Sequence, residues 1–182
     1  MSGPRKVEVL FGEKAIADRT AGLAQEIAAA APKNLLVVAI LKGSFMFAAD
    51  LLRAMHRAGL QPQVEFFHLT SYRDGTTSSG VVTILRDVES AVKGRDVLLV
   101  DDILESGRTL AFAKDLMAAR GARRVMVCTL LEKKDKRQVP VEADFVGFSC
   151  PDVFVVGYGM DVAHSYRELP YIGRVVPTGE KA

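Results

Sequence analysis

Short runs of consecutive apolar residues alternate along the chain with longer segments in which apolar residues recur every three or four positions. The first pattern is typical of strands buried on both faces, and the second is typical of helices that bury one face. Strands are predicted at 34–41, 64–69, 81–85, 96–100, 124–131, 144–148 and 154–157, with 81–85 at a sheet edge. Helices are predicted at 13–31, 44–58 and 110–120, and Gly59 and Gly121 are expected to end the last two.

This alternation predicts an α/β fold, in which a mostly parallel sheet is flanked by helices through right-handed crossovers. The chain is expected to form one domain over residues 1–182. Its core would span about 34–131, and a small hood would come from 1–12 and parts of 132–182. Ligands in such folds bind beyond the carboxyl ends of the strands, so the loops at those ends are the candidate site.

Composition narrows the class of protein without deciding its chemistry. The chain has 182 residues, of which 49% are hydrophobic and 25% charged, as in ordinary globular proteins. Its net charge of +2 is too small to argue for a nucleic-acid partner. Cys128 and Cys150 lie in apolar surroundings and are expected to be buried free thiols. With no long apolar stretch to suggest a signal or membrane span, the cytoplasm is the expected location.

The most informative segment is 97–110, where a buried strand runs into a polar turn and then a helix. Asp101 and Asp102 are expected to follow the end of the strand. The turn 105–109 (Glu-Ser-Gly-Arg-Thr) offers free backbone N–H groups and hydroxyls at a helix start, which suits a phosphate. Acids beside such a turn would repel a bare phosphate. They fit a ligand that also brings hydroxyls or Mg²⁺, such as a phosphorylated sugar carrying a diphosphate. The plain alternative is a strand–helix connection capped by Asp.

Three other polar loops also follow predicted strands, at 42–43, 71–72 and 133–134. The first and third of these loops also have a plainer interpretation. Lys42 and Gly43 could be a surface lysine and a turn glycine, and the charged run 132–137 could be a solvated face. Likewise, Phe154 could be a core aromatic, and Arg167 could pair with Glu168 on the surface.

The segment 97–110 resembles the phosphoribosyl-diphosphate signature of the type I phosphoribosyltransferases. Most of the chain, from about Leu35 to Val176, resembles the 6-oxopurine branch of that family. The likeness also rests on Leu-Lys-Gly-Ser-Phe at 41–45, Ser-Tyr-Arg-Asp-Gly at 71–75, Asp-Phe-Val-Gly-Phe at 144–148, the segment 151–161 and Tyr-Arg-Glu-Leu-Pro-Tyr-Ile-Gly at 166–173. The resemblance implies a Rossmann-like fold and the joining of a 6-oxopurine to phosphoribosyl diphosphate, with Mg²⁺ as cofactor.

The resemblance also implies a role for each matching position. Lys42 and Gly43 would bind diphosphate, with a cis peptide between them, and Arg167 would assist. The acids Asp101 and Asp102 would hold the ribose hydroxyls directly or through Mg²⁺, and Asp161 would lie near a second Mg²⁺ beside the base. The 5′-phosphate would bind Ser106, Gly107, Arg108 and Thr109; the purine would meet Lys133, Phe154 and Val155; and Ser71 and Tyr72 would belong to a mobile lid.

Glu105 would be the general base, although the family usually has Asp there, and Asp101 stands where Glu is common.

Three alternative functions remain open: a regulator that binds phosphoribosyl diphosphate and contacts nucleic acid, an enzyme of the same fold that uses xanthine, and a plain nucleotide binder. The expected partners are phosphoribosyl diphosphate and a purine base, with neither nucleic acid nor membrane. Apolar residues at 45–47 (Phe-Met-Phe) predict a homodimer or homotetramer.

Overall fold

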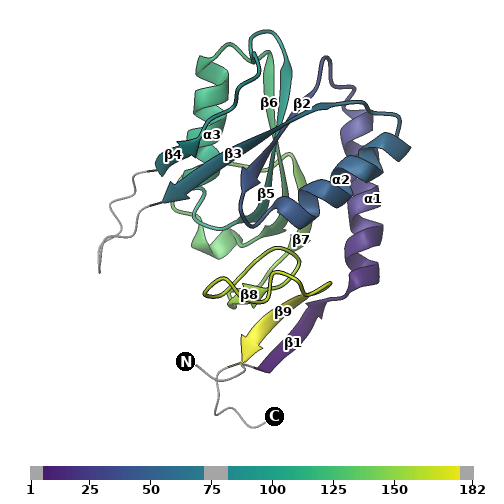
Figure 1. Ribbon diagram of the computed structural model, residues 1–182, viewed down its shortest axis with the longest axis vertical. Coiled ribbons are helices and arrows are strands. Elements are labelled where there is room, and N and C mark those ends of the chain that lie inside the picture. The colour runs from purple at the N-terminus through teal and green to yellow at the C-terminus, as the bar shows by residue number, and fades with distance from the viewer. Residues whose placement is uncertain (1–5, 72–81, 177–182) are drawn as a thin grey trace.

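The computed structural model describes residues 6–71 and 82–176, and its centre is a six-stranded sheet (Figure 1). The strands lie in the order β4-β3-β2-β5-β6-β7, and every neighbouring pair is parallel except β3 and β4. Their bounds are β2 Leu36–Leu41, β3 Gln63–Ser71, β4 Val82–Arg86, β5 Asp96–Leu104, β6 Arg124–Glu132 and β7 Phe145–Ser149. The predicted α/β class is confirmed, and so is the edge position of the strand at 82–86.

Helices cover both faces of this sheet. Helices α1 (Glu13–Ala29) and α2 (Phe45–Arg57) pack on one face, α3 (Arg108–Ala119) packs on the other, and a short 3-10 helix η1 spans Lys134–Lys136 (Figure 1). Because successive side chains of a strand point to opposite faces of the sheet, each of the central strands β2, β5 and β6 contributes to two separate core layers. In β2, Val37 and Ala39 pack with α1 and α2, whereas Leu36 and Val38 pack with α3. Because both faces are covered, the strands read as continuous apolar runs.

A second, smaller sheet joins the two ends of the described chain. It is antiparallel, with the order β1-β9-β8, and is formed by β1 (Lys6–Phe11), β9 (Ile172–Val176) and β8 (Val155–Val156). Figure 1 places it beyond the main sheet, next to the loops around β8. Apolar periodicity predicts neither β1 nor β9. The segment 145–149 belongs to the main sheet as β7. Within the described residues, no helix is long and apolar enough to span a membrane.

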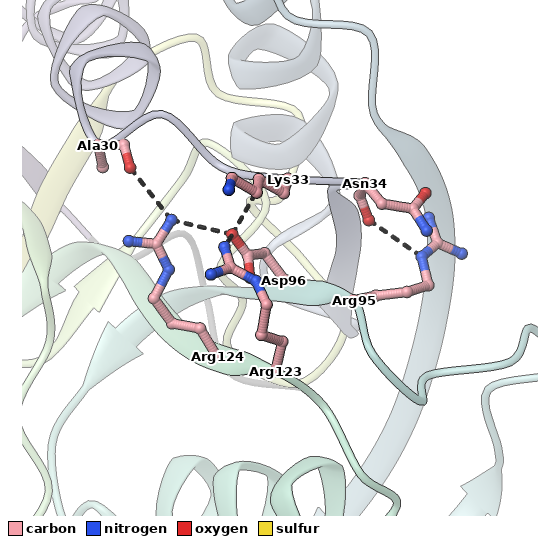
Figure 2. Close-up of polar contacts among 7 residues, drawn as sticks. All are labelled: Ala30, Lys33, Asn34, Arg95, Asp96, Arg123 and Arg124. Carbon is pink, nitrogen blue, oxygen red and sulfur yellow. Dashed lines mark hydrogen bonds and ion pairs between the residues drawn. The ribbon is translucent and has the colours of Figure 1, made fainter.

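A buried carboxylate holds the amino ends of the central strands together (Figure 2). Asp96, the first residue of β5, is fully buried and accepts a hydrogen bond from the Lys33 N–H at 2.8 Å. It also pairs with the guanidinium groups of Arg123 and Arg124. Burial alone would raise the pKa of Asp96, but these donors outweigh it and the pKa is lowered. The cluster therefore stabilises the sheet at the edge opposite to the loops expected to carry the chemistry.

Candidate active site

A cavity of about 650 Å³ opens at the carboxyl ends of the main-sheet strands. Its walls come from the ends of β2, β3, β5 and β6 and from the segment around β8. Nine residues that the sequence singled out line it: Lys42, Gly43, Asp102, Glu105, Lys133, Phe154, Val155, Asp161 and Arg167. Residues far apart in sequence thus converge where ligands bind in parallel α/β folds.

The loop after β2 brings the backbone close to an acidic side chain. A Cβ at Gly43 would overlap Oδ2 of Asp102, so only glycine allows this approach. The cis peptide lies between Leu41 and Lys42. The prediction that it lies between Lys42 and Gly43 is therefore wrong, because the motif alone does not distinguish the two bonds that flank Lys42.

Strand β5 is longer than its apolar run predicts. It pairs with β2 only as far as Val100 but stays paired with β6 as far as Leu104. Asp101 and Asp102 therefore lie inside the strand, which corrects the prediction that they follow its end. Successive strand residues project to alternate faces. Accordingly, Asp102 lines the larger cavity, whereas Asp101 lines a smaller one of about 170 Å³.

The two carboxyl groups resist carrying negative charge together. Burial raises the pKa of the Asp101 carboxyl well above its usual range, and the neighbouring Asp102 carboxylate raises it further. Burial also raises the pKa of Asp102, although the hydrogen bond with the Asp101 side chain, backbone N–H groups and the Arg167 charge oppose this shift. Such a pair is suited to a ligand that brings positive charge or hydroxyl donors.

The smaller cavity lies against the turn that opens α3. Ser106, Gly107 and Thr109 line it together with Asp101 and Glu105. Gly107 precedes α3 with φ +84° and offers no side chain to cap it. The Arg108 N–H donates to Oγ of Ser106 at 3.4 Å, and the N–H groups that follow it can meet an anion. The Arg108 side chain instead donates from Nε to Oε1 of Gln138 at 3.1 Å, outside this cavity.

Lys133 and Glu105 form an ion pair in the wall of the larger cavity. Nζ of Lys133 lies 3.2 Å from Oε1 of Glu105, and the Lys133 N–H donates to the Leu104 carbonyl. Lys133 is buried, whereas the next three residues of the charged run are exposed. The solvated-face interpretation therefore fails for Lys133 itself.

The remaining predicted residues come from the segment that follows β7. Phe154 is 56% exposed on the cavity, so it is not a core aromatic. Arg167 pairs with Asp161 at 2.7 Å rather than with Glu168, and it donates to the Gly159 carbonyl. Within the part of the chain that the structure describes, no three His, Cys, Asp or Glu side chains converge as a ready metal site.

Sequence reasoning missed several cavity residues, among them His68, Thr70, Leu85, Met160 and His164. The rule that sites lie at carboxyl strand ends could have found His68 and Thr70, which are near the end of β3. Leu85 lies on the antiparallel edge strand, where that rule says nothing. The Ser71 backbone ends β3, and Tyr72 lies outside the described residues.

Known proteins resemble this chain over nearly its whole length. A family model described as a phosphoribosyl transferase domain matches residues 7–163. The hypoxanthine-guanine phosphoribosyltransferase of Dictyostelium discoideum is 41% identical over 92% of this chain and 94% of its own. The hypoxanthine phosphoribosyltransferase of Escherichia coli K12 is also 41% identical, over 93% and 96%. A crystal structure of a Staphylococcus aureus hypoxanthine phosphoribosyltransferase has a TM-score of 0.88 at 38% identity, covering 96% of this chain and 94% of that one.

The chain therefore belongs to the phosphoribosyltransferases, whose type I fold matches the sheet and helices described above. Within that family it belongs to the hypoxanthine and hypoxanthine-guanine branch, the transferases of purine salvage.

Proposed function

We propose that the chain transfers the 5-phosphoribosyl group from phosphoribosyl diphosphate to hypoxanthine and guanine, giving inosine or guanosine monophosphate and diphosphate. One observation supports this proposal most strongly. Lys133 and Phe154 lie at the same edge of the sheet as the acid pair, Asp101 and Asp102, and the phosphate turn, residues 105–109. This arrangement places side chains suited to a purine base, to ribose hydroxyls and to a phosphate next to one another. It therefore fits a reaction between a phosphorylated sugar and a planar base.

In this proposal the two cavities divide the substrates between them. The turn 106–109 holds the 5′-phosphate in the smaller cavity, and Asp101 and Asp102 hold the ribose hydroxyls between the two. Lys42 and Arg167 neutralise the departing diphosphate, with Asp161 fixing the Arg167 guanidinium. Lys133 donates to the purine 6-oxygen, Phe154 stacks on the ring, and the Val155 backbone meets the base edge.

The acid pair fits Mg²⁺. Mg²⁺ binds proteins through one or two carboxylates and takes its other ligands from water and substrate phosphates. Asp101 and Asp102 supply two carboxylates, and because burial raises the pKa of both, a bound cation would stabilise their charged forms. Asp161 is the third carboxylate expected near a metal. Bound Mg²⁺ would supply charge neutralisation for the diphosphate as it leaves.

Catalysis by this chain's own residues is chiefly positioning and proton transfer. Breaking the bond at the ribose C1 develops oxocarbenium character, so orientation of the base and exclusion of water matter most. Glu105 lies beside the base-reading Lys133 and takes the proton from the purine ring as N9 attacks.

The decisive assay supplies phosphoribosyl diphosphate and Mg²⁺ with hypoxanthine, guanine or xanthine, and measures nucleoside monophosphate by chromatography. Formation of inosine and guanosine monophosphate is expected. Xanthosine monophosphate as the main product would favour the xanthine-using alternative. Binding of phosphoribosyl diphosphate without any product would favour the regulator.

Replacing Lys133 with methionine is expected to raise KM for hypoxanthine and guanine far more than KM for phosphoribosyl diphosphate. Methionine keeps the length of the buried stem but removes the donor to the purine 6-oxygen, a loss of about 1.5–3 kcal/mol for a charged hydrogen bond. Steady-state kinetics with each substrate varied in turn will test this. Lys134→Met is the matched control, because Lys134 is exposed and does not line the cavity. Equal losses for both substrates would contradict the assignment.

Replacing both Asp101 and Asp102 with asparagine is expected to weaken Mg²⁺-dependent binding of phosphoribosyl diphosphate and to leave the fold intact. Asparagine keeps the shape of each side chain but removes the carboxylate charge that would hold the ribose hydroxyls or Mg²⁺. Calorimetry with and without Mg²⁺ measures the affinity. An unchanged affinity in the double variant would remove the sugar-site assignment.

The chain assembles as a homo-oligomer in the cytoplasm in this proposal. Phe45 on α2 and Val64 and Phe66 on β3 are exposed apolar side chains, which supports a contact with a second copy. Phe47 is fully buried in the core, so the prediction that the whole run 45–47 lies at an interface is wrong for that residue. Cys128 and Cys150 are free and buried, as expected in a reducing compartment. Light scattering of the purified chain tests the assembly.

A further inference from the structure

Arg137, the last residue of the charged run, connects the end of β6 with the turn that carries Glu105. One guanidinium nitrogen donates to the Glu105 carbonyl oxygen at 3.1 Å, and the other donates to Oε1 of Glu132 at 3.0 Å. The side chain is only 16% exposed. Unlike its exposed neighbours Lys134 and Lys136, Arg137 is therefore held between two elements of the site.

Its partner Glu132 explains why Arg137 has one defined position. Glu132 ends β6, and its side chain is 6% exposed. Its other cationic neighbour, Lys134, is 3.8 Å away and 75% exposed, so it screens the carboxylate weakly. A buried carboxylate needs a close, well-oriented cation. The planar guanidinium of Arg137 meets that need with one nitrogen and keeps the other for the Glu105 carbonyl. The Glu132 carboxylate thus fixes Arg137, and Arg137 in turn fixes the Glu105 carbonyl.

The residues next to Arg137 support the same turn from the other side. The N–H groups of Gln138 and Val139 both donate to the Ser106 carbonyl, at 2.9 and 3.1 Å. A Cβ at Gly107 would lie 2.8 Å from the Val139 carbonyl oxygen and 3.1 Å from Cδ of Arg137. The phosphate turn is therefore packed against residues 137–139 with no room for displacement in that direction.

We propose that Arg137 is a positioning residue, which holds the turn 105–109 in the form that accepts the 5′-phosphate and directs the Glu105 carboxylate toward the base. This inference rests on the proposed function. Arg137 itself lines neither cavity and would not touch substrate. It acts through the backbone of Glu105 and through the packing against Gly107.

Arg137→Met is expected to raise the Kd for inosine monophosphate and to lower kcat, each by about tenfold, the scale of effect when a catalytic group is misplaced by part of an ångström. The affinity for pyrophosphate with Mg²⁺ should stay at the wild-type value, because pyrophosphate binds near Lys42 and Arg167, away from this turn. Arg137→Lys keeps the charge but cannot span both partners, so it should recover the folding stability better than the kcat. Calorimetry and steady-state kinetics give these values.

Two further variants separate positioning from general loss of structure. Arg137→Met combined with Glu132→Gln removes the stranded buried carboxylate and preserves folding, and it should keep the defects in kcat and inosine monophosphate binding. Lys136→Met makes the same change of charge one residue away, in an exposed pair with Asp152, and should behave as wild type. Adding Arg137→Met to Glu105→Gln should lower kcat by less than about threefold, since residues that act as a unit are not additive.

The outcomes distinguish this inference from the function on which it rests. A wild-type chain that forms no nucleoside monophosphate would overturn the proposed function. An active wild type, with Arg137→Met retaining wild-type kcat and inosine monophosphate affinity, would overturn the positioning role alone. Equal weakening of inosine monophosphate and pyrophosphate in the Glu132→Gln, Arg137→Met variant would also overturn it, since the effect would then be structural.

Discussion

Replacing Glu105 with glutamine is expected to lower kcat by roughly 10²–10⁴, the usual range for loss of a general base. Glutamine has nearly the same shape and can still accept a hydrogen bond from Lys133, which lies 3.2 Å from the Glu105 carboxylate. What it cannot do is take the proton from the purine ring as N9 attacks. Affinity for phosphoribosyl diphosphate should be nearly unchanged, because the sugar acids and phosphate turn are untouched. Single-turnover kinetics with hypoxanthine will isolate the chemical step.

Glu105→Asp separates two explanations for the longer side chain. If Glu105 is the base, aspartate should retain much of the activity, because it restores the residue usual in the family. If Glu105 only pairs with Lys133 and stabilises the turn, both variants should show a raised KM for the base and a near wild-type kcat. A glutamine variant with wild-type kcat would exclude Glu105 as base. Catalysis would then depend on positioning and diphosphate neutralisation alone.

The placement of the site could be predicted from the sequence because one topological rule governs it. In a parallel sheet every strand ends at the same edge, so the loops at 42–43, 105–109 and 133–134 had to meet once the strands were recognised. Strand recognition was easy because β2, β5 and β6 are covered on both faces and consist of apolar runs. Lys133, the residue proposed to bind the purine 6-oxygen, was ambiguous in the sequence only because exposed charged residues follow it.

What could not be predicted depends on contacts between distant segments. The strands β1 and β9 pair with each other across almost the whole chain, and each is too short and too mixed in its apolar pattern to be recognised alone. The extension of β5 through Asp101 and Asp102 depends on continued pairing with β6 after β2 has diverged. The connection of Arg137 to Glu105 and Glu132 joins residues that no local pattern associates.

The second large effect is expected far from the chemistry, at Asp96. Asp96→Ala removes a fully buried carboxylate that binds the Lys33 N–H, Arg123 and Arg124 at the amino ends of β5 and β6 (Figure 2). The free energy of unfolding should fall by about 3 kcal/mol, the lower end for a broken buried ion pair, because both arginines keep contact with water. For a chain of this size, Tm should fall by about 6–12 °C. The kcat at 25 °C should not change, since the cluster lies at the opposite edge from the site.

The pH dependence of stability gives a sharper test of the same cluster. Because the pKa of Asp96 is lowered in the folded protein, its stabilisation is complete above the unfolded value of about 3.9 and is lost as pH falls through the folded value. Asp96→Asn keeps the shape and an acceptor for the Lys33 N–H but never ionises. The difference in unfolding free energy between wild type and Asp96→Asn, measured in urea, should be constant from pH 7 to pH 5 and shrink below about pH 4. If the difference in unfolding free energy stays constant below pH 4 as well, the Asp96 charge contributes nothing to stability. Shape and hydrogen bonding alone would then hold the strand ends.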